Sequence, residues 1–142
     1  MTPRLACLAA LLLLSTQIAS AVKLNDEELP MVAELCKVTA PTPRELLRKL
    51  VDRYELRLAA LTCGAEGAFL IAGDEESACP AVPAKVVDTV GAGDAFTATL
   101  VPDFLRGLPL GEVNRHANAV ASFVCSQPGA VMKLPDYLAQ LA

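Results

Sequence analysis

The sequence lacks tryptophan, has a single histidine, and draws only 4% of its residues from the aromatic types. It also has no basic run, and its net charge of −4 argues against a nucleic-acid surface. No CxxC pair occurs and His116 stands apart from the cysteines, which argues against a zinc site. The five cysteines are odd in number and scattered, so we expect free thiols of a reducing compartment, with a disulfide between some pair left open.

What the chain has instead is an apolar composition. Apolar residues make up 54% of the 142, and Val, Leu and Ala dominate. That length is enough for one domain with a real core. Aliphatic residues in these proportions suit strands buried on both faces and covered by helices, so the predicted fold class is α/β.

The N-terminal segment is set apart from the rest. Arg4 precedes an apolar run from Leu5 to Leu14, and Ala19-Ser20-Ala21 has the small-x-small form of a signal-peptidase site. The run is too short for a comfortable membrane span. Residues 1–21 are therefore interpreted as a signal-like segment or as a mis-started reading frame, and residues 22–142 as the domain proper.

Local patterns predict most of the remaining elements. Thr42-Pro43-Arg44-Glu45 carries the residues of a helix start, and leucines then recur at helical spacing. We expect strands over 58–62 and 68–72, a turn over 73–76, helices over 92–105 and 111–124, and a short helix over 135–141. Residues 22–29 are typical of a strand end followed by a helix start, where Asn25 is an N-cap and Glu28 completes a capping box.

The most informative stretch runs from Val86 to Thr97. The β-branched pair Val86-Val87 predicts a strand that leads into a turn containing Gly91 and Gly93, with a helix after it. Free N–H groups and the dipole at a helix start favour a bound anion. Asp94, in the first turn, could then accept the proton of a phosphate acceptor's hydroxyl. The alternative interpretation is an ordinary tight turn with a helix-start carboxylate.

The longer pattern Asp-Thr-x-Gly-Ala-Gly-Asp, over residues 88–94, resembles the C-terminal signature of the PfkB (ribokinase-like) carbohydrate kinases. The resemblance extends over residues 22–141. It implies a ribokinase-like three-layer α/β/α sandwich, of which this chain carries only the C-terminal part, without the lid and the N-terminal half. It also implies ATP-dependent phosphorylation of a sugar hydroxyl, fructokinase-like, with this truncated chain expected to be inactive alone.

By this resemblance, Asp94 is the catalytic base, and the backbone N–H groups of residues 91–93 stabilise the transferred phosphoryl group. The catalytic set is Asp94, Gly91, Ala92 and Gly93. The nucleotide-binding set is Thr62, Gly64, Gly67, Thr89 and Asn118, the last beside the adenine. Two alternatives stay open: Gly64 and Gly67 as turn residues, and Asn114 and Asn118 as exposed polar residues.

The resemblance also implies two metal sites. Asn25 and Glu28 would help to hold magnesium through water. A potassium ion would be bound by Asp88, Val90, Val124, Gln127 and Gly129. Lys133 stands where ribokinase has a later hydroxyl ligand, which is a departure from the potassium pattern.

The expected partners are ATP and a sugar, with no nucleic acid and no membrane, in the cytoplasm. A half-sheet would expose an apolar edge, so a homo-oligomer or a complementing chain is expected to cover it. If residues 1–21 are a functional signal peptide, the location is instead secreted. The alternative functions are a secreted or non-catalytic α/β binding domain and a nucleotide-binding remnant.

Overall fold

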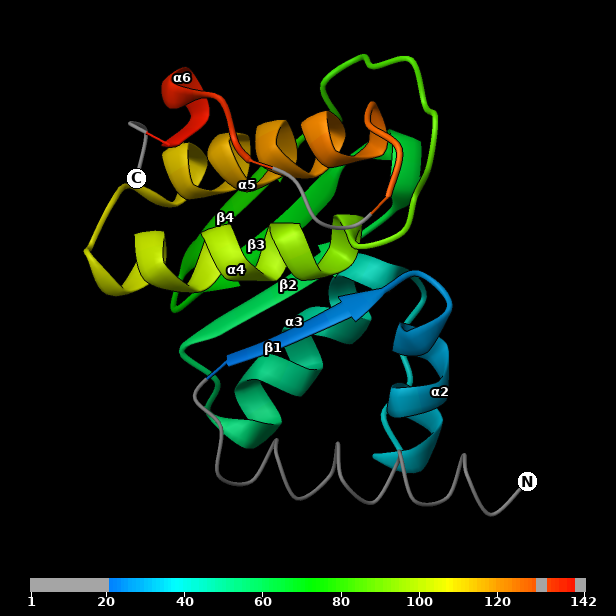
Figure 1. Ribbon diagram of the computed structural model, residues 1–142. Coiled ribbons are helices and arrows are strands. Elements are labelled where there is room, and N and C mark those ends of the chain that lie inside the picture. The colour runs from blue at the N-terminus through cyan, green and yellow to red at the C-terminus, as the bar shows by residue number, and fades with distance from the viewer. Residues whose placement is uncertain (1–20, 130–132, 140–142) are drawn as a thin grey trace. The chain divides into compact units, whose positions relative to one another are not determined.

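The computed structural model describes residues 21–129 and 133–139 (Figure 1). The apolar N-terminal segment therefore lies outside the described residues, apart from Ala21. Contacts divide the described residues into two compact units, one of residues 21–62 and 70–75 and the other of residues 63–69, 76–129 and 133–139. The elements are β1 (Ala21–Asn25), α2 (Glu28–Leu35), α3 (Pro43–Tyr54), β2 (Leu58–Thr62), the 3₁₀ turn η1 (Gly64–Glu66), β3 (Ala68–Ala72), β4 (Glu75–Cys79), α4 (Ala92–Leu105), α5 (Leu110–Cys125) and α6 (Asp136–Ala139).

The strands form one sheet in the order β1-β2-β3-β4. β1 pairs in parallel with β2, in a register that runs from Ala21 opposite Leu58 to Asn25 opposite Thr62. A parallel pair needs a long crossover connection, and here α2 and α3 supply it. Residues Leu58 to Leu61 of β2 are all buried, which is the pattern of a strand covered on both faces.

Helix α3 begins where the sequence predicts. Thr42 is the N-cap, in the extended conformation, and its hydroxyl oxygen accepts a hydrogen bond from the backbone N–H of Glu45. Pro43 follows at the first helical position, where its missing N–H costs nothing. Leu47, Leu50 and Val51 form the buried face of the helix, which packs against β2.

In the second unit, α4 and α5 lie side by side along their length (Figure 1). α4 buries Phe96 and Leu100, and α5 buries an apolar row at helical spacing that includes Val113, Ala117 and Val120. Both helices were predicted within one residue of their observed bounds. Among the residues that the structure describes, no helix is both long and apolar enough to cross a membrane.

Strand β4 was not predicted. Its residues read Glu-Glu-Ser-Ala-Cys, of which Glu75, Glu76 and Ala78 are exposed, so the strand shows no apolar alternation. It forms because a turn at Gly73 and Asp74 brings this segment back beside β3.

Candidate functional site

The candidate site is centred on the start of α4, in the second unit. Gly91 is the N-cap and has a φ of 80°, in the left-handed region that glycine adopts readily. The N–H of Ala95 donates to the Gly91 carbonyl over 2.9 Å, so the preceding N–H groups of Gly93 and Asp94 have no acceptor within the helix. The N–H of Ala92 makes a long turn contact of 3.3 Å to the Thr89 carbonyl.

This geometry confirms the predicted helix start and suits an anion. The exposed side chain of Asp94 projects from the same first turn that carries the free amides. Two amides without an acceptor among the described residues, and the positive end of a 14-residue helix, attract negative charge. A hydroxyl that approached a phosphate bound there would meet a carboxylate able to accept its proton.

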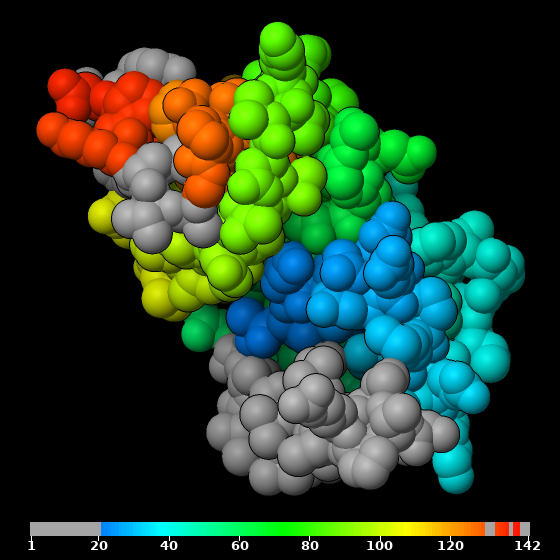
Figure 2. Space-filling view, turned by 45° about the vertical axis from the view of Figure 1, so that its right-hand side comes forward, coloured from blue at the N-terminus to red at the C-terminus, as the bar shows by residue number. Residues whose placement is uncertain are grey.

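The predicted strand at Val86-Val87 is wrong. The segment from Pro80 to Val90 forms no strand, and the two valine residues are 63% and 55% exposed. The N–H groups of Val87 and Asp88 instead both donate to the Cys125 carbonyl, at 2.8 and 3.2 Å. Residues 86–88 therefore lie against the end of α5, and Figure 2 shows this stretch of the surface beside the segment that follows α5.

The carboxylate of Asp88 connects two loops. Its Oδ1 accepts the N–H of Val90 at 2.9 Å, and its Oδ2 accepts the N–H of Gly129 at 3.4 Å. Three of the residues predicted as potassium ligands are thus brought together by hydrogen bonds. The Val124 carbonyl, a fourth, accepts the N–H of Gln127 at 3.1 Å. Carbonyl and carboxylate oxygens of this kind are the donors that a hard cation prefers.

The loop from Cys63 to Gly67 is closed on itself. The N–H of Cys63 donates to the Gly67 carbonyl at 2.8 Å, and the N–H of Gly67 donates to the Gly64 carbonyl at 3.1 Å. Gly67 has a φ of 98°, and a Cβ atom there would lie 2.0 Å from the Cys79 carbonyl oxygen. Glycine is therefore required at this position for both space and conformation. Thr62, also predicted to bind nucleotide, ends β2 in the other unit, where its hydroxyl lies 3.5 Å from the Leu24 carbonyl.

The alternative interpretation of Asn114 and Asn118 as exposed polar residues is wrong. Asn114 is 0% and Asn118 is 5% exposed. The Nδ2 group of Asn118 donates to the Oδ1 atom of Asn114 at 2.8 Å and to its backbone carbonyl at 2.9 Å. Both amides are buried polar groups held in hydrogen bonds, as burial requires.

Asn25 and Glu28 form a reciprocal cap in the first unit. Asn25 Oδ1 accepts the N–H of Glu28 at 2.7 Å, and Glu28 Oε2 accepts the N–H of Asn25 at 2.8 Å. The reciprocal hydrogen bonds of the predicted capping box are therefore confirmed. The N-cap of α2 is Glu27 rather than Asn25, because the helix itself begins only at Glu28. The second carboxylate oxygen of Glu28 is not part of this exchange, and a carboxylate with a neighbouring amide oxygen is a donor set suited to magnesium.

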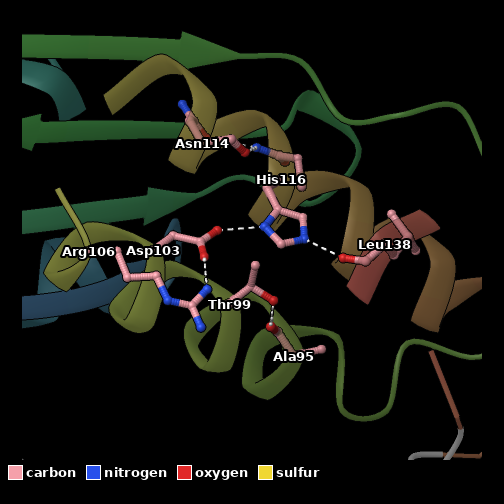
Figure 3. A network of polar contacts seen from close by, with 8 residues as sticks. Ala95, Thr99, Asp103, Arg106, Asn114, His116 and Leu138 are labelled. Atoms are coloured by element: carbon pink, nitrogen blue, oxygen red, sulfur yellow. Dashed lines mark hydrogen bonds and ion pairs between the residues drawn. The ribbon is translucent and has the colours of Figure 1, made fainter. Parts of the chain in front are cut away.

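A buried polar network in the second unit was not predicted (Figure 3). Asp103 of α4, 1% exposed, lies 2.5 Å through Oδ2 from His116 Nδ1 of α5. The other ring nitrogen of His116 lies 2.8 Å from the Leu138 carbonyl of α6, and Arg106 approaches Asp103 Oδ1 at 3.7 Å. The one available signal was Asp103 itself, a carboxylate far from the helix start and flanked by the apolar residues Leu100, Val101, Pro102, Phe104 and Leu105.

No disulfide joins any two of the described cysteines, Cys36, Cys63, Cys79 and Cys125, and Cys7 lies outside the described residues. Burial raises the pKa of the Cys79 thiol, while Arg115 acts in the opposite direction. Burial also raises the pKa of the Cys125 thiol, and the negative charge of Asp88 raises it further. No cluster of three or more His, Cys, Asp or Glu side chains that could hold a metal occurs among the residues described.

Comparison with known proteins shows which protein family the chain belongs to. The sequence pattern of the pfkB family carbohydrate kinases matches residues 2–136. The chain belongs to this family. Over 91 residues it is 39% identical to a nucleoside kinase of Methanothermobacter thermautotrophicus, and the match covers 61% of this chain and 29% of that protein.

Solved structures agree with the family assignment. Ribokinase from Thermotoga maritima is similar with a TM-score of 0.75 at 19% identity, over 89% of this chain and 43% of that one. Aminoimidazole riboside kinase from Salmonella enterica, solved with its riboside and an ATP analogue, gives a TM-score of 0.73 at 29% identity, over 94% and 46%. The predicted ribokinase-like α/β fold is confirmed, and the chain spans less than half the length of these relatives.

Proposed function

We propose that this chain is the nucleotide-binding and catalytic part of an enzyme that transfers a phosphoryl group from ATP to a hydroxyl of a sugar. The observation that carries the proposal is the start of α4, where two free amides and the carboxylate of Asp94 occur in one exposed helical turn. Family membership supports phosphoryl transfer as the reaction class. The chain also holds the rest of the signature, from Asp88 to Asp94.

In this proposal Asp94 accepts the proton of the attacking hydroxyl. The N–H groups of residues 91–93 stabilise the charge that develops on the transferred phosphoryl group. The N–H of Ala92 already donates weakly to the Thr89 carbonyl. We therefore expect the N–H groups of Gly93 and Asp94 to contribute more to stabilising the phosphoryl group. Positioning and electrostatics account for most of the rate enhancement in such reactions.

The same proposal assigns the nucleotide to Thr62, Gly64, Gly67, Thr89 and Asn118. Gly64 is exposed and Gly67 has a fixed, left-handed backbone, so their loop offers a rigid main-chain surface to a ligand. The amide of Asn118 is engaged with Asn114. We therefore expect Asn118 to make van der Waals contact with the base rather than a hydrogen bond through Nδ2.

Asn25 and Glu28 would hold magnesium through water, using the carboxylate oxygen that the cap leaves over. When bound, the metal would neutralise charge on the ATP phosphates. The connected loops of Asp88, Val90 and Gly129, with Val124 and Gln127, would hold potassium. The loop that these hydrogen bonds fix is the one that leads directly into α4.

For the acceptor we propose fructose or a related sugar, on the likeness of residues 88–94 and 125–130 to fructokinases. The Salmonella relative acts on a riboside and the archaeal one on nucleosides, which makes a ribosyl acceptor the natural comparison substrate. We propose a cytoplasmic location, because a reaction that consumes ATP belongs inside cells. The secreted alternative requires cleavage after Ala21, and mass spectrometry of the mature protein tests it.

A nucleotide-binding remnant is the second candidate, because the chain spans 43% to 46% of the solved relatives' length. We propose that the chain binds ATP but turns over little sugar unless a second copy or a complementing chain completes the fold. A remnant would bind ATP with no measurable transfer under either condition.

The test measures ATP affinity by calorimetry on the chain alone, and phosphoryl transfer to fructose and ribosides by mass spectrometry with a complementing chain added. Three proteins are compared: the wild type, Asp94→Asn, and Asp52→Asn, an exposed control on α3. We expect ATP affinities within about threefold of one another, and a transfer rate lowered on the order of a hundredfold or more in Asp94→Asn only. A wild-type chain that binds no ATP would contradict the proposed function. An Asp94→Asn variant that transfers at the wild-type rate would contradict the role of Asp94 as the base.

A further inference from the structure

Asn114 lies wholly inside the second unit, and its side chain connects α5 to two strands. Its Nδ2 group donates to the Ala68 carbonyl of β3 at 3.1 Å and to the Ser77 carbonyl of β4 at 3.0 Å, with Ser77 Oγ at 3.1 Å. A side-chain amide has only two N–H groups. One therefore serves Ala68, and the other is shared between the two oxygen atoms of Ser77.

The orientation of this amide is fixed by its neighbour. Asn118 donates to Asn114 Oδ1 at 2.8 Å, one helical turn further along α5. A flipped Asn114 amide would place its N–H groups against those of Asn118 and its oxygen against two carbonyls. Only one orientation satisfies all the partners, so Asn114 holds the two strands in a single arrangement.

The strand positions that Asn114 holds adjoin the Cys63–Gly67 loop. Ala68 follows Gly67 directly, and the backbone of Gly67 is packed against that of Cys79 and Pro80, at the end of β4. A shift of β3 at Ala68 or of β4 between Ser77 and Cys79 would therefore displace the loop or create a clash at Gly67. Because the loop is closed by its own backbone hydrogen bonds, it moves as one piece with Ala68.

We propose that Asn114 is a positioning residue for nucleotide binding, which from α5 fixes the start of β3 and the middle of β4 and so sets the backbone of the Cys63–Gly67 loop. The nucleotide role of the loop rests on the proposed function. The fixing of the loop does not, and it can be measured without ATP. Asn114 acts through the loop and through Asn118, and it is not placed in contact with the nucleotide.

The experiment compares Asn114→Leu, which keeps the branched shape of the side chain but removes its donors and its acceptor, with Ser77→Ala, which keeps both carbonyl contacts. Two quantities are measured on each: amide hydrogen exchange of residues 63–69, and the dissociation constant of Mg–ATP by calorimetry. For Asn114→Leu we expect exchange in the loop and the dissociation constant each to rise about tenfold, while exchange over residues 96–104 of α4 stays unchanged. For Ser77→Ala we expect both quantities within about twofold of wild type.

Asn114→Ser is the second variant if Asn114→Leu does not fold, since its smaller side chain leaves room for water to bond to the same carbonyls. We expect it to raise both quantities about threefold. Unchanged loop exchange in a folded variant overturns the inference. Faster loop exchange with unchanged ATP affinity overturns the nucleotide role of Asn114 alone. Wild type that binds no ATP overturns the proposed function, and with it the nucleotide half of this inference.

Discussion

His116 Nδ1 lies 2.5 Å from Asp103 Oδ2, so a buried carboxylate of α4 faces a buried imidazole of α5. The imidazole reaches the Leu138 carbonyl through its other nitrogen, so one side chain joins three helices of the second unit. This contact sets where α4 lies against α5. The start of α4, which carries Asp94, is positioned by the same packing.

Asp103→Ala should destabilise the protein strongly, because it leaves His116 buried without its carboxylate. Breaking a buried pair by removing one partner costs about 3 kcal/mol or more. The free energy of unfolding is measured by urea titration followed by circular dichroism. Asp52→Ala, at an exposed position of α3, is the control and should change it by less than about 0.5 kcal/mol. A loss below about 1 kcal/mol for Asp103→Ala would mean that the pair contributes little.

Gly67→Ala should be far more damaging than Gly73→Ala, although both glycine residues have a positive φ. A Cβ atom at Gly67 would lie 2.0 Å from a backbone oxygen, whereas at Gly73 it would meet nothing within 4 Å. We expect a loss of about 3 kcal/mol for Gly67→Ala and about 1 kcal/mol for Gly73→Ala, from the same urea titration. Equal losses would show that the Cys79 backbone yields to the new side chain.

Glu28→Gln separates capping from metal binding, because a glutamine oxygen can still accept the N–H of Asn25. The free energy of unfolding should stay within about 0.5 kcal/mol of wild type, whereas Glu28→Ala should lose about 1 kcal/mol. The magnesium concentration that half-saturates ATP binding should rise about tenfold in both variants. If Glu28→Gln leaves the magnesium dependence unchanged, the residue is only a cap.

Asp88→Asn should speed alkylation of Cys125. Burial and the charge of Asp88 both raise the pKa of this thiol, so removing the charge lowers the pKa and increases the thiolate fraction at a given pH. Iodoacetamide labelling near pH 8, read by mass spectrometry, measures the rate at each cysteine. Cys79 is the internal control, since its pKa is raised by burial and lowered by Arg115. A slower or unchanged rate at Cys125 would contradict the electrostatic coupling.

The elements that could be predicted are those whose signals are local. Thr42, Pro43 and Glu45 act within one turn, and α3 begins as they indicate. The glycine residues and the apolar run after Gly91 likewise gave the bounds of α4. Val86-Val87 misled because a β-branched pair favours a strand only where a ladder partner exists, and here the Val87 N–H donates to Cys125 instead.

The rest depends on partners that are distant in the sequence. Asn114 finds acceptors 46 and 37 residues away, and His116 finds Asp103 at a separation of 13. A polar residue on a helix is equally compatible with exposure or with a buried hydrogen bond until its neighbours are known. The polar network that joins α4, α5 and α6 therefore became visible only in the structure.

The central claim is that the start of α4 binds the phosphates of ATP. Titration of the ¹⁵N-labelled chain with Mg–ATP, followed by two-dimensional NMR, tests it one amide at a time. We predict the largest shifts at Gly93 and Asp94, smaller ones at Gly64 and Gly67, and none along α3. Saturating ATP that leaves the Gly93 and Asp94 amides unmoved would contradict the account.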